Sequence, residues 1–127
     1  MKFKLINGLP VLTIIIEYQN NTMYLEDVLL DTGCAVSIFD TDMVEDIGLT
    51  IDRKSGRAVR MNGIGGKSEL CYQQIANKIS INQITLNNFT LQLGMTKIPY
   101  GFSAILGADF CDKAGLIIDF KEHLVRF

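Results

Sequence analysis

Short runs of apolar and β-branched residues, separated by turn-forming residues, recur along the whole chain. These runs predict strands over residues 2–6, 11–18, 23–30, 36–39, 57–61, 67–76, 78–81, 84–93 and 105–106, and a last hairpin of 116–120 with 124–127. Asn7-Gly8 predicts a tight turn, and Asn20-Asn21 predicts the turn of a hairpin. The alternation near Asn87-Asn88 is imperfect, which predicts a β-bulge there.

Two short helices are predicted between the strands. Thr41 is a suitable N-cap for a helix over residues 42–47, whose acidic residues favour the first turns, and Gly48 is suited to end it. Gly107 precedes a second predicted helix over residues 108–114.

The number of strands relative to helices determines the expected fold class. Residues 95–102 contain a proline and a glycine and are predicted to form a loop. Many short strands with few helices are typical of an all-β sandwich or barrel. The sequence has no repeat, linker or low-complexity segment, so we expect residues 1–127 to form a single domain.

Composition excludes several functional classes. The formal net charge is −2 and the basic residues are scattered, so we expect no nucleic-acid partner. No apolar run reaches the roughly 18 residues that a membrane span needs, so we expect no membrane partner. Three widely spaced cysteines and one histidine match neither a disulfide framework nor a zinc site. We therefore expect no metal, no cofactor, and a reducing, cytoplasmic location.

One acidic residue stands at the end of a strongly apolar strand. The strand over 23–30 runs directly into Asp31-Thr32-Gly33. An acid at this position either closes an Asx turn or carries out catalysis. Two later motifs favour catalysis: the glycine-rich segment 62–66, predicted to be a hairpin tip, and Ile105-Leu106-Gly107 before the second helix.

These three motifs, in this order, resemble the retropepsin-like aspartic proteases over roughly residues 11–127. The resemblance implies the acid-protease fold, a closed β-barrel with one or two short helices. It also implies an aspartic endopeptidase in which Asp31, Thr32 and Gly33 are the catalytic motif. The implied substrate-binding residues are those of the flap tip and two near the catalytic motif, namely Gly63, Ile64, Gly65, Gly66, Ala35 and Ile105.

The chemistry of this family requires two carboxyl groups. One carboxylate takes a proton from water while one carboxylic acid polarises the peptide carbonyl. Two carboxylates about 4 Å apart repel by roughly 4 kcal/mol at an effective dielectric constant near 20, or about three pKa units, so the pair holds one proton. Because the chain has one Asp-Thr-Gly, the resemblance implies a homodimer with Asp31 from each subunit, which binds a peptide or protein substrate as an added strand.

An alternative remains open at this stage. The chain would then be a non-catalytic peptide-binding or dimerisation domain on the same scaffold. The form of the dimer is open as well, because viral relatives interleave their terminal strands and residues 1–6 and 124–127 are able to do the same.

Cys34 departs from the family pattern, which commonly has Ala or Ser at this position. We favour a small buried thiol that packs like Ala. The alternative is a thiol that raises the pKa of the catalytic pair and makes the site sensitive to oxidation.

Other candidate residues have simpler interpretations. Asp109, in the first turn of a predicted helix, is expected to cap that helix rather than serve as a second acid. Asp119 is expected to be structural and His123 to be solvated in a polar turn. Tyr100 and Phe102 are expected either to line substrate pockets or to pack in the core.

Overall fold

The computed structural model describes residues 1–52, 54, 56–62 and 68–127. The strands of this part are β1 (Lys4–Ile6), β2 (Leu9–Tyr18), β3 (Asn21–Leu30), β4 (Ile38–Asp40), β5 (Arg57–Asn62), β6 (Ser68–Ile81), β7 (Ile84–Gly94), β8 (Ala104–Leu106), β9 (Ile117–Asp119) and β10 (Leu124–Arg126). The helices are α1 (Thr41–Val44), the 3₁₀-helix η1 (Glu45–Ile47), α2 (Lys97–Tyr100) and α3 (Ala108–Ala114).

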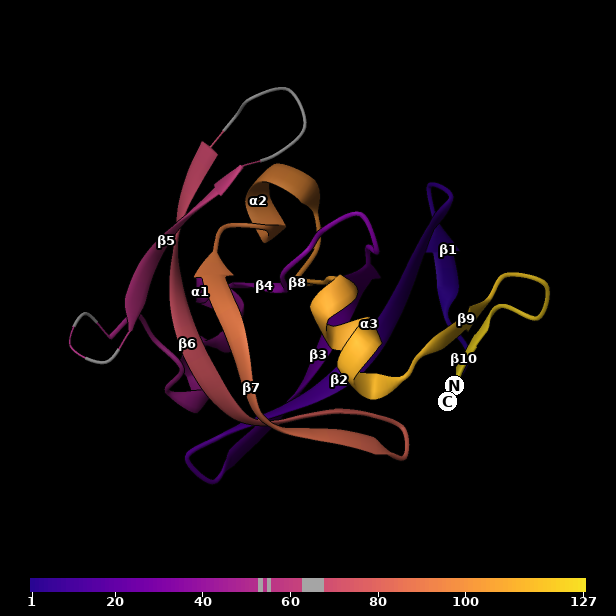
Figure 1. The fold of residues 1–127 in the computed structure, drawn as a ribbon, viewed down its shortest axis with the longest axis horizontal. Coiled ribbons are helices and arrows are strands. Elements are labelled where there is room, and N and C mark those ends of the chain that lie inside the picture. The colour runs from indigo at the N-terminus through magenta and orange to yellow at the C-terminus, as the bar shows by residue number, and fades with distance from the viewer. Residues whose placement is uncertain (53, 55, 63–67) are drawn as a thin grey trace.

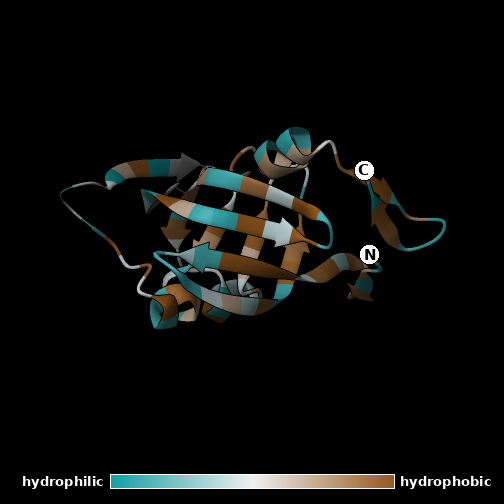
Figure 2. Ribbon diagram, turned by 90° about the horizontal axis from the view of Figure 1, so that it is seen from below, coloured by the Kyte–Doolittle hydropathy of each residue, from teal (hydrophilic) through white to brown (hydrophobic). Residues whose placement is uncertain are grey.

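The main sheet is ring-like. Over the described residues it has eight strands in the order β1-β2-β3-β8-β4-β7-β6-β5, and β2 pairs additionally with β6 (Figure 1). This extra pairing joins the two sides of the sheet, so one apolar face is enclosed. Figure 2 shows polar and apolar residues alternating along the strands, as expected when one face of a sheet is buried. The prediction of a mostly-β fold is confirmed.

The enclosed face forms the hydrophobic core. Large side chains from strands on opposite sides of the ring are fully buried there, and Phe110 of α3 packs edge-on against Phe89 of β7 with ring centroids 5.6 Å apart. Helix α3 therefore closes one end of the core. Because α3 follows β8 directly, the same packing fixes the position of the β8–α3 junction.

Strand β8 is inserted between β3 and β4. It runs parallel to β3, where Leu29 faces Ile105, and antiparallel to β4, where Ile38 faces Ile105. The loop that joins β3 to β4 therefore passes around the end of β8. This loop contains Asp31, so the sheet order places the Asp-Thr-Gly motif beside the β8–α3 junction.

The two termini pair with each other within the chain. Lys2 bridges Leu124, the N–H of Phe3 donates to His123 O at 3.0 Å, and the N–H of Val125 donates to Met1 O at 2.8 Å. Both ends lie together in Figure 1. The predicted last hairpin is confirmed as β9 and β10, and its pairing with the N-terminal segment is intramolecular.

The predicted position of the first helix is corrected at its start. The N-cap is Asp40, the last residue of β4, whose Oδ1 accepts the N–H of Asp42 at 3.0 Å. Thr41 is the first helical residue instead of the cap, because Asp40, which follows the predicted strand over 36–39, both ends β4 and supplies the capping carboxylate. The helix then tightens into η1 and ends at Gly48, with φ of 83°, as predicted.

Two predictions in the second half of the sheet are wrong. Two strands were predicted over 67–76 and 78–81, but the described residues 68–81 form the single strand β6, whose pairing with β7 continues past Asn77. The same ladder keeps its register at Asn88 despite a φ of 51°, so no residue is inserted there. A β-bulge occurs instead where β2 pairs with β3. The register of that ladder shifts between Leu12 and Ile14 of β2, beside Asp27 of β3, which has a φ of 57°. The continuity of β6 and the position of the bulge depend on pairing between strands that are distant in sequence, and the local alternation of polar and apolar residues does not predict that pairing.

The loop predicted over residues 95–102 contains helix α2. Pro99 lies inside this short helix, and Gly101 ends it with φ of 85°. The turn between β2 and β3 is made by Gln19 and Asn20, one position earlier than predicted. No helix in the described part of the chain has the length and apolar character needed to span a membrane.

Candidate active site

Asp31 lies directly after β3 and is held in a turn. Its N–H donates to Leu106 O at 2.9 Å, its Oδ1 accepts the N–H of Gly33 at 3.0 Å, and its carbonyl oxygen accepts the N–H of Cys34 at 3.1 Å. The Asx-turn interpretation is therefore correct as local structure. The turn engages one of the two carboxylate oxygens, so it is compatible with a catalytic role.

The structure places the other predicted site residues around this turn. Thr32, Gly33 and Ala35 are exposed, whereas Ile105 is half-buried on β8 next to β3 and β4. A Cβ added at Gly33 would lie 3.2 Å from Asp31 Oδ1, tighter than an ordinary contact. The absence of a side chain at Gly33 therefore leaves room for the Asp31 carboxylate to accept the N–H of Gly33.

The predicted flap-tip residues Gly63, Ile64, Gly65 and Gly66 lie outside the described residues. The strands on either side, β5 and β6, pair antiparallel from Arg57 with Gln73 to Asn62 with Ser68. The two arms of the predicted hairpin are thus present.

The buried Ser37 and the half-buried Asp109 form a polar pair behind the loop, and sequence reasoning did not identify Ser37. The N–H of Ser37 donates to Asp109 Oδ2 at 3.0 Å and its hydroxyl donates to Asp109 Oδ1 at 2.8 Å. The same hydroxyl accepts the N–H of Gly107 at 3.0 Å. Asp109 also accepts the N–H of Phe110 at 2.8 Å within the first turn of α3. The N-cap of this helix is Gly107 and no side chain caps it, so Asp109 lies in the first turn as predicted but binds the loop instead of capping the helix. A single serine in an apolar strand gives no signal of this role.

Gly107 permits the close approach of the loop to α3. A Cβ at this position would lie 2.4 Å from Cys34 O and 3.0 Å from Val36 O, distances that side chains do not tolerate against backbone. The N–H of Ala108 donates to Cys34 O at 2.7 Å across this contact. The glycine of the Ile-Leu-Gly motif is therefore required by packing against the Asp31 loop.

Cys34 is half-buried, and its thiol donates to Val36 O at 3.0 Å. Burial raises the pKa of this thiol, and the negative charges of Asp31 and Asp109 raise it further against the opposing effect of the Val36 hydrogen bond. The group is therefore a neutral thiol at neutral pH, bonded to backbone within its own loop. This geometry agrees with the interpretation of a small packed side chain.

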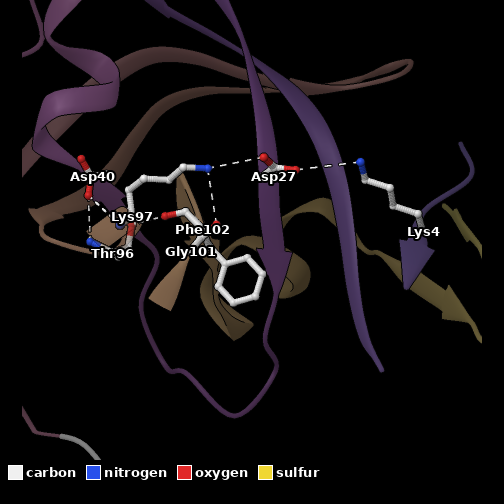
Figure 3. Close-up of polar contacts among 7 residues, drawn as sticks. All are labelled: Lys4, Asp27, Asp40, Thr96, Lys97, Gly101 and Phe102. Carbon is white, nitrogen blue, oxygen red and sulfur yellow. Dashed lines mark hydrogen bonds and ion pairs between the residues drawn. The ribbon is translucent and has the colours of Figure 1, made fainter. Parts of the chain in front are cut away.

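Helix α2 is anchored to the sheet by two aspartates (Figure 3). The buried Asp40 uses Oδ2 to accept the N–H groups of Thr96 at 2.9 Å and Lys97 at 2.8 Å. The Lys97 ammonium lies 3.4 Å from Asp27 Oδ2, and Lys4 lies 3.9 Å from Asp27 Oδ1. The start of α2 is thus hydrogen-bonded to a buried carboxylate, and the Lys97 side chain adds a half-exposed ion pair.

An apolar groove of about 640 Å³ separates α2 from strand β6. It is lined by Thr41, Ile51, Leu70, Tyr72, Leu93, Gly94, Met95, Ile98 and Pro99. Ile98, at 81% exposure, is the most exposed large apolar residue in the described part of the chain. Sequence reasoning selected Tyr100 and Phe102, which do not line this groove. The apolar Ile98-Pro99 pair within a predicted surface loop was the available signal.

Asp119 and His123 are placed in the terminal hairpin. Asp119 accepts the N–H groups of Lys121 and Glu122 and pairs with Arg126 at 2.8 Å; these contacts, led by the Glu122 N–H, lower its pKa. His123 is exposed with φ of 53° and lies against Phe3. Asp119 is therefore structural, as predicted. Within the described residues, no cluster of three or more His, Cys, Asp or Glu side chains is placed to hold a metal ion.

Comparison with known proteins defines the class to which this fold and site belong. The family described as "Aspartyl protease" matches residues 20–110, well over half of the chain, so the chain belongs to this family. No curated protein matches.

Two solved structures share the fold. One is a retropepsin-like aspartic protease from Rickettsia conorii, with TM-score 0.67 and 15% identity over 98% of this chain and 86% of that one. The other is the retroviral protease-like domain of Ddi1 from Leishmania major, with TM-score 0.56 and 14% identity over 92% of this chain and 86% of that one. The predicted retropepsin-like fold is confirmed.

Proposed function

We propose that this protein is an aspartic endopeptidase that is active as a homodimer, with one catalytic Asp31 from each subunit. The observation that carries the proposal is the placement of Asp31: it ends β3 in an ordered turn beside the Ile-Leu-Gly strand, in a chain of the aspartyl protease family. The exposure of Thr32 and Ala35 in the same loop supports the proposal, because a second copy has access to them.

The reaction requires the two Asp31 carboxyl groups to share one proton. The ionised group takes a proton from water, whose oxygen attacks the peptide carbonyl carbon, while the protonated group donates to the carbonyl oxygen. The tetrahedral intermediate then breaks its C–N bond as a proton passes to the leaving nitrogen. The shared proton makes the two chemically identical carboxyls act as acid and base.

The groove supports a substrate with bulky apolar side chains. Its floor at Gly94 adjoins Ile38, because a Cβ at Gly94 would lie 3.2 Å from Ile38 Cγ2, and Ile38 faces Ile105 beside the Asp31 loop. An extended peptide bound near Asp31 would be able to place an apolar side chain against Ile98 and Leu70. We propose that the predicted flap tip, residues 63–66, covers this peptide.

The substitution Asp31→Asn tests the proposal. It removes the titratable group while keeping the size of the side chain, so cleavage of a peptide library or a denatured protein should fall by at least about a thousandfold. Circular dichroism and sedimentation of the variant are expected to match the wild-type protein. Turnover that persists in a folded Asp31→Asn variant would contradict the mechanism.

The second candidate is a non-catalytic peptide-binding or dimerisation domain on the same scaffold, because the fold that this chain shares with the Ddi1 domain does not by itself establish catalysis. Wild-type protein that assembles as a dimer, binds unstructured peptides and cleaves none of them from about pH 3 to 8 would establish that candidate.

A further inference from the structure

The loop that carries Asp31 is bound to the β8–α3 junction at both of its ends. At the start, the N–H of Asp31 donates to Leu106 O at 2.9 Å. In the middle, Cys34 O accepts the N–H of Ala108 at 2.7 Å. At the far end, Ser37 is held by Asp109. The first two contacts use backbone alone, so the third is the one that depends on side chains.

The Ser37–Asp109 pair is shielded from water on the serine side, where Ser37 is fully buried. Asp109 accepts three hydrogen bonds, from the N–H of Ser37, the hydroxyl of Ser37 and the N–H of Phe110. The Ser37 hydroxyl is at the same time the acceptor for the N–H of Gly107. The Asp109 carboxylate and the Ser37 hydroxyl thus join the residue before β4 to the β8–α3 junction and to the first turn of α3.

The donors around Asp109 require a carboxylate. An asparagine of the same shape would direct its NH₂ either at the N–H of Ser37 or at the N–H of Phe110, depending on its orientation. Each orientation places two donors against each other, so at least one hydrogen bond is lost. No flip of the amide recovers the arrangement.

We propose that Asp109 and Ser37 are positioning residues for Asp31: together they fix the loop 31–37 so that the carboxylate meets its counterpart in a second copy of the chain. This inference rests on the proposed function. The separation of the two carboxyls determines how strongly they share a proton, and a displacement near 1 Å at a reacting group lowers rates by about a hundredfold.

The experiment compares Asp109→Asn with Asp112→Asn. Asp112 is an exposed acid on the same helix, so the control makes the same charge change away from the loop. Asp109→Asn is expected to lower kcat by about ten- to a hundredfold with KM changed less than about threefold. Its kcat/KM profile should show two apparent pKa values that lie closer together than in the wild-type protein, because the carboxyls have moved apart. Asp112→Asn is expected to match the wild type in both.

A second pair of variants separates positioning from stability. Ser37→Ala is expected to lower kcat as Asp109→Asn does. The kcat of the double variant should be only slightly lower than that of either single variant, because both substitutions remove the same hydrogen-bonded pair. Amide hydrogen exchange at Gly107 and Cys34 should accelerate in both, at temperatures where the variants are folded.

Three results would overturn the inference. The first is wild-type kcat and pH profile in folded Asp109→Asn and Ser37→Ala. The second is activity that declines only in proportion to the folded fraction of each variant, which assigns the pair to stability alone. The third is an amide-exchange result that does not depend on activity, for the case in which the wild-type protein shows no Asp31-dependent cleavage and the proposed function fails. If amide hydrogen exchange at Gly107 and Cys34 is then unchanged in both Asp109→Asn and Ser37→Ala, the pair does not hold the loop and the inference is wrong as well.

Discussion

At the scale of single residues, the thiol of Cys34 shows how its surroundings set reactivity beside a candidate catalytic acid. The side chain is half-buried, bonds to the backbone of Val36, and lies within reach of the negative charges of Asp31 and Asp109. Burial and these charges favour the neutral thiol over the thiolate, which is the reactive species. We therefore expect Cys34 to be protected at neutral pH despite its place in the active-site loop.

Alkylation of the folded protein tests this expectation. At pH 8, Cys34 should react with iodoacetamide at least about threefold more slowly than a free cysteine peptide, since its raised pKa leaves less thiolate. The midpoint of the rate against pH should lie above 9.0, the ordinary pKa of a thiol, because burial raises the pKa of Cys34. Peptide mapping by mass spectrometry resolves Cys34 from Cys71 and Cys111.

The same measurement on Asp31→Asn is an internal check. Removal of that charge should raise the Cys34 alkylation rate at fixed pH, because one of the groups that raise the thiol pKa is gone. Reaction of wild-type Cys34 as fast as the free peptide would contradict the placement of the thiol.

At the scale of elements, the position of α2 depends on one buried acid more than on the visible ion pairs. Asp40 satisfies the N–H groups of Asp42, Thr96 and Lys97, whereas Asp27 contacts the lysines near the surface. Buried backbone donors without partners are costly, and exposed ion pairs contribute little.

Asp40→Ala is therefore predicted to lower the free energy of unfolding by roughly 2 to 4 kcal/mol, because α1 loses its cap and the N–H groups of Thr96 and Lys97 at the start of α2 lose their acceptor. Urea unfolding followed by circular dichroism measures the loss. The matched comparison is Asp27→Asn, which keeps a residue tolerant of the observed φ of 57° and should cost less than about 1 kcal/mol. Equal losses in the two variants would contradict this assignment.

At the scale of the whole molecule, the intramolecular pairing of the termini bears on assembly. Lys2 and Leu124 already pair within one chain, so a second copy cannot use those same backbone groups without opening them. A dimer that forms around the exposed Thr32 and Ala35 leaves this pairing intact. Assembly and folding of the subunit are then separable events.

Subunit mixing tests the assembly. When wild-type protein is equilibrated with about nine parts of Asp31→Asn, random pairing leaves only about one-tenth of the wild-type subunits with a wild-type partner. Peptidase activity per wild-type subunit should therefore fall about tenfold. The control is the same excess of an unrelated protein, which should leave the activity unchanged. Activity that stays constant in the mixture would show that a single subunit carries the complete site.

The amino-acid sequence by itself determined the elements whose causes are local. Alternation of apolar residues located most strands, Asn7-Gly8 and Gly48 located chain reversals, and the helix over 108–114 ended where predicted. The sequence singled out the motifs at Asp31 and Ile105-Leu106-Gly107, and the structure shows that the strands before them, β3 and β8, pair with each other. These strands, turns and helix ends were predictable because each depends on a few neighbouring residues.

Only the tertiary structure decided the features that arise between distant segments. The continuity of β6 and the register of β7 follow from pairing across the sheet, and the groove follows from α2 standing opposite β6. Asp109 and Ser37 are 72 residues apart, and nothing in either local sequence marks them as partners. Hydrogen bonds form wherever the fold brings donor and acceptor together, so the residues behind Asp31 became identifiable only once the chain was folded around it.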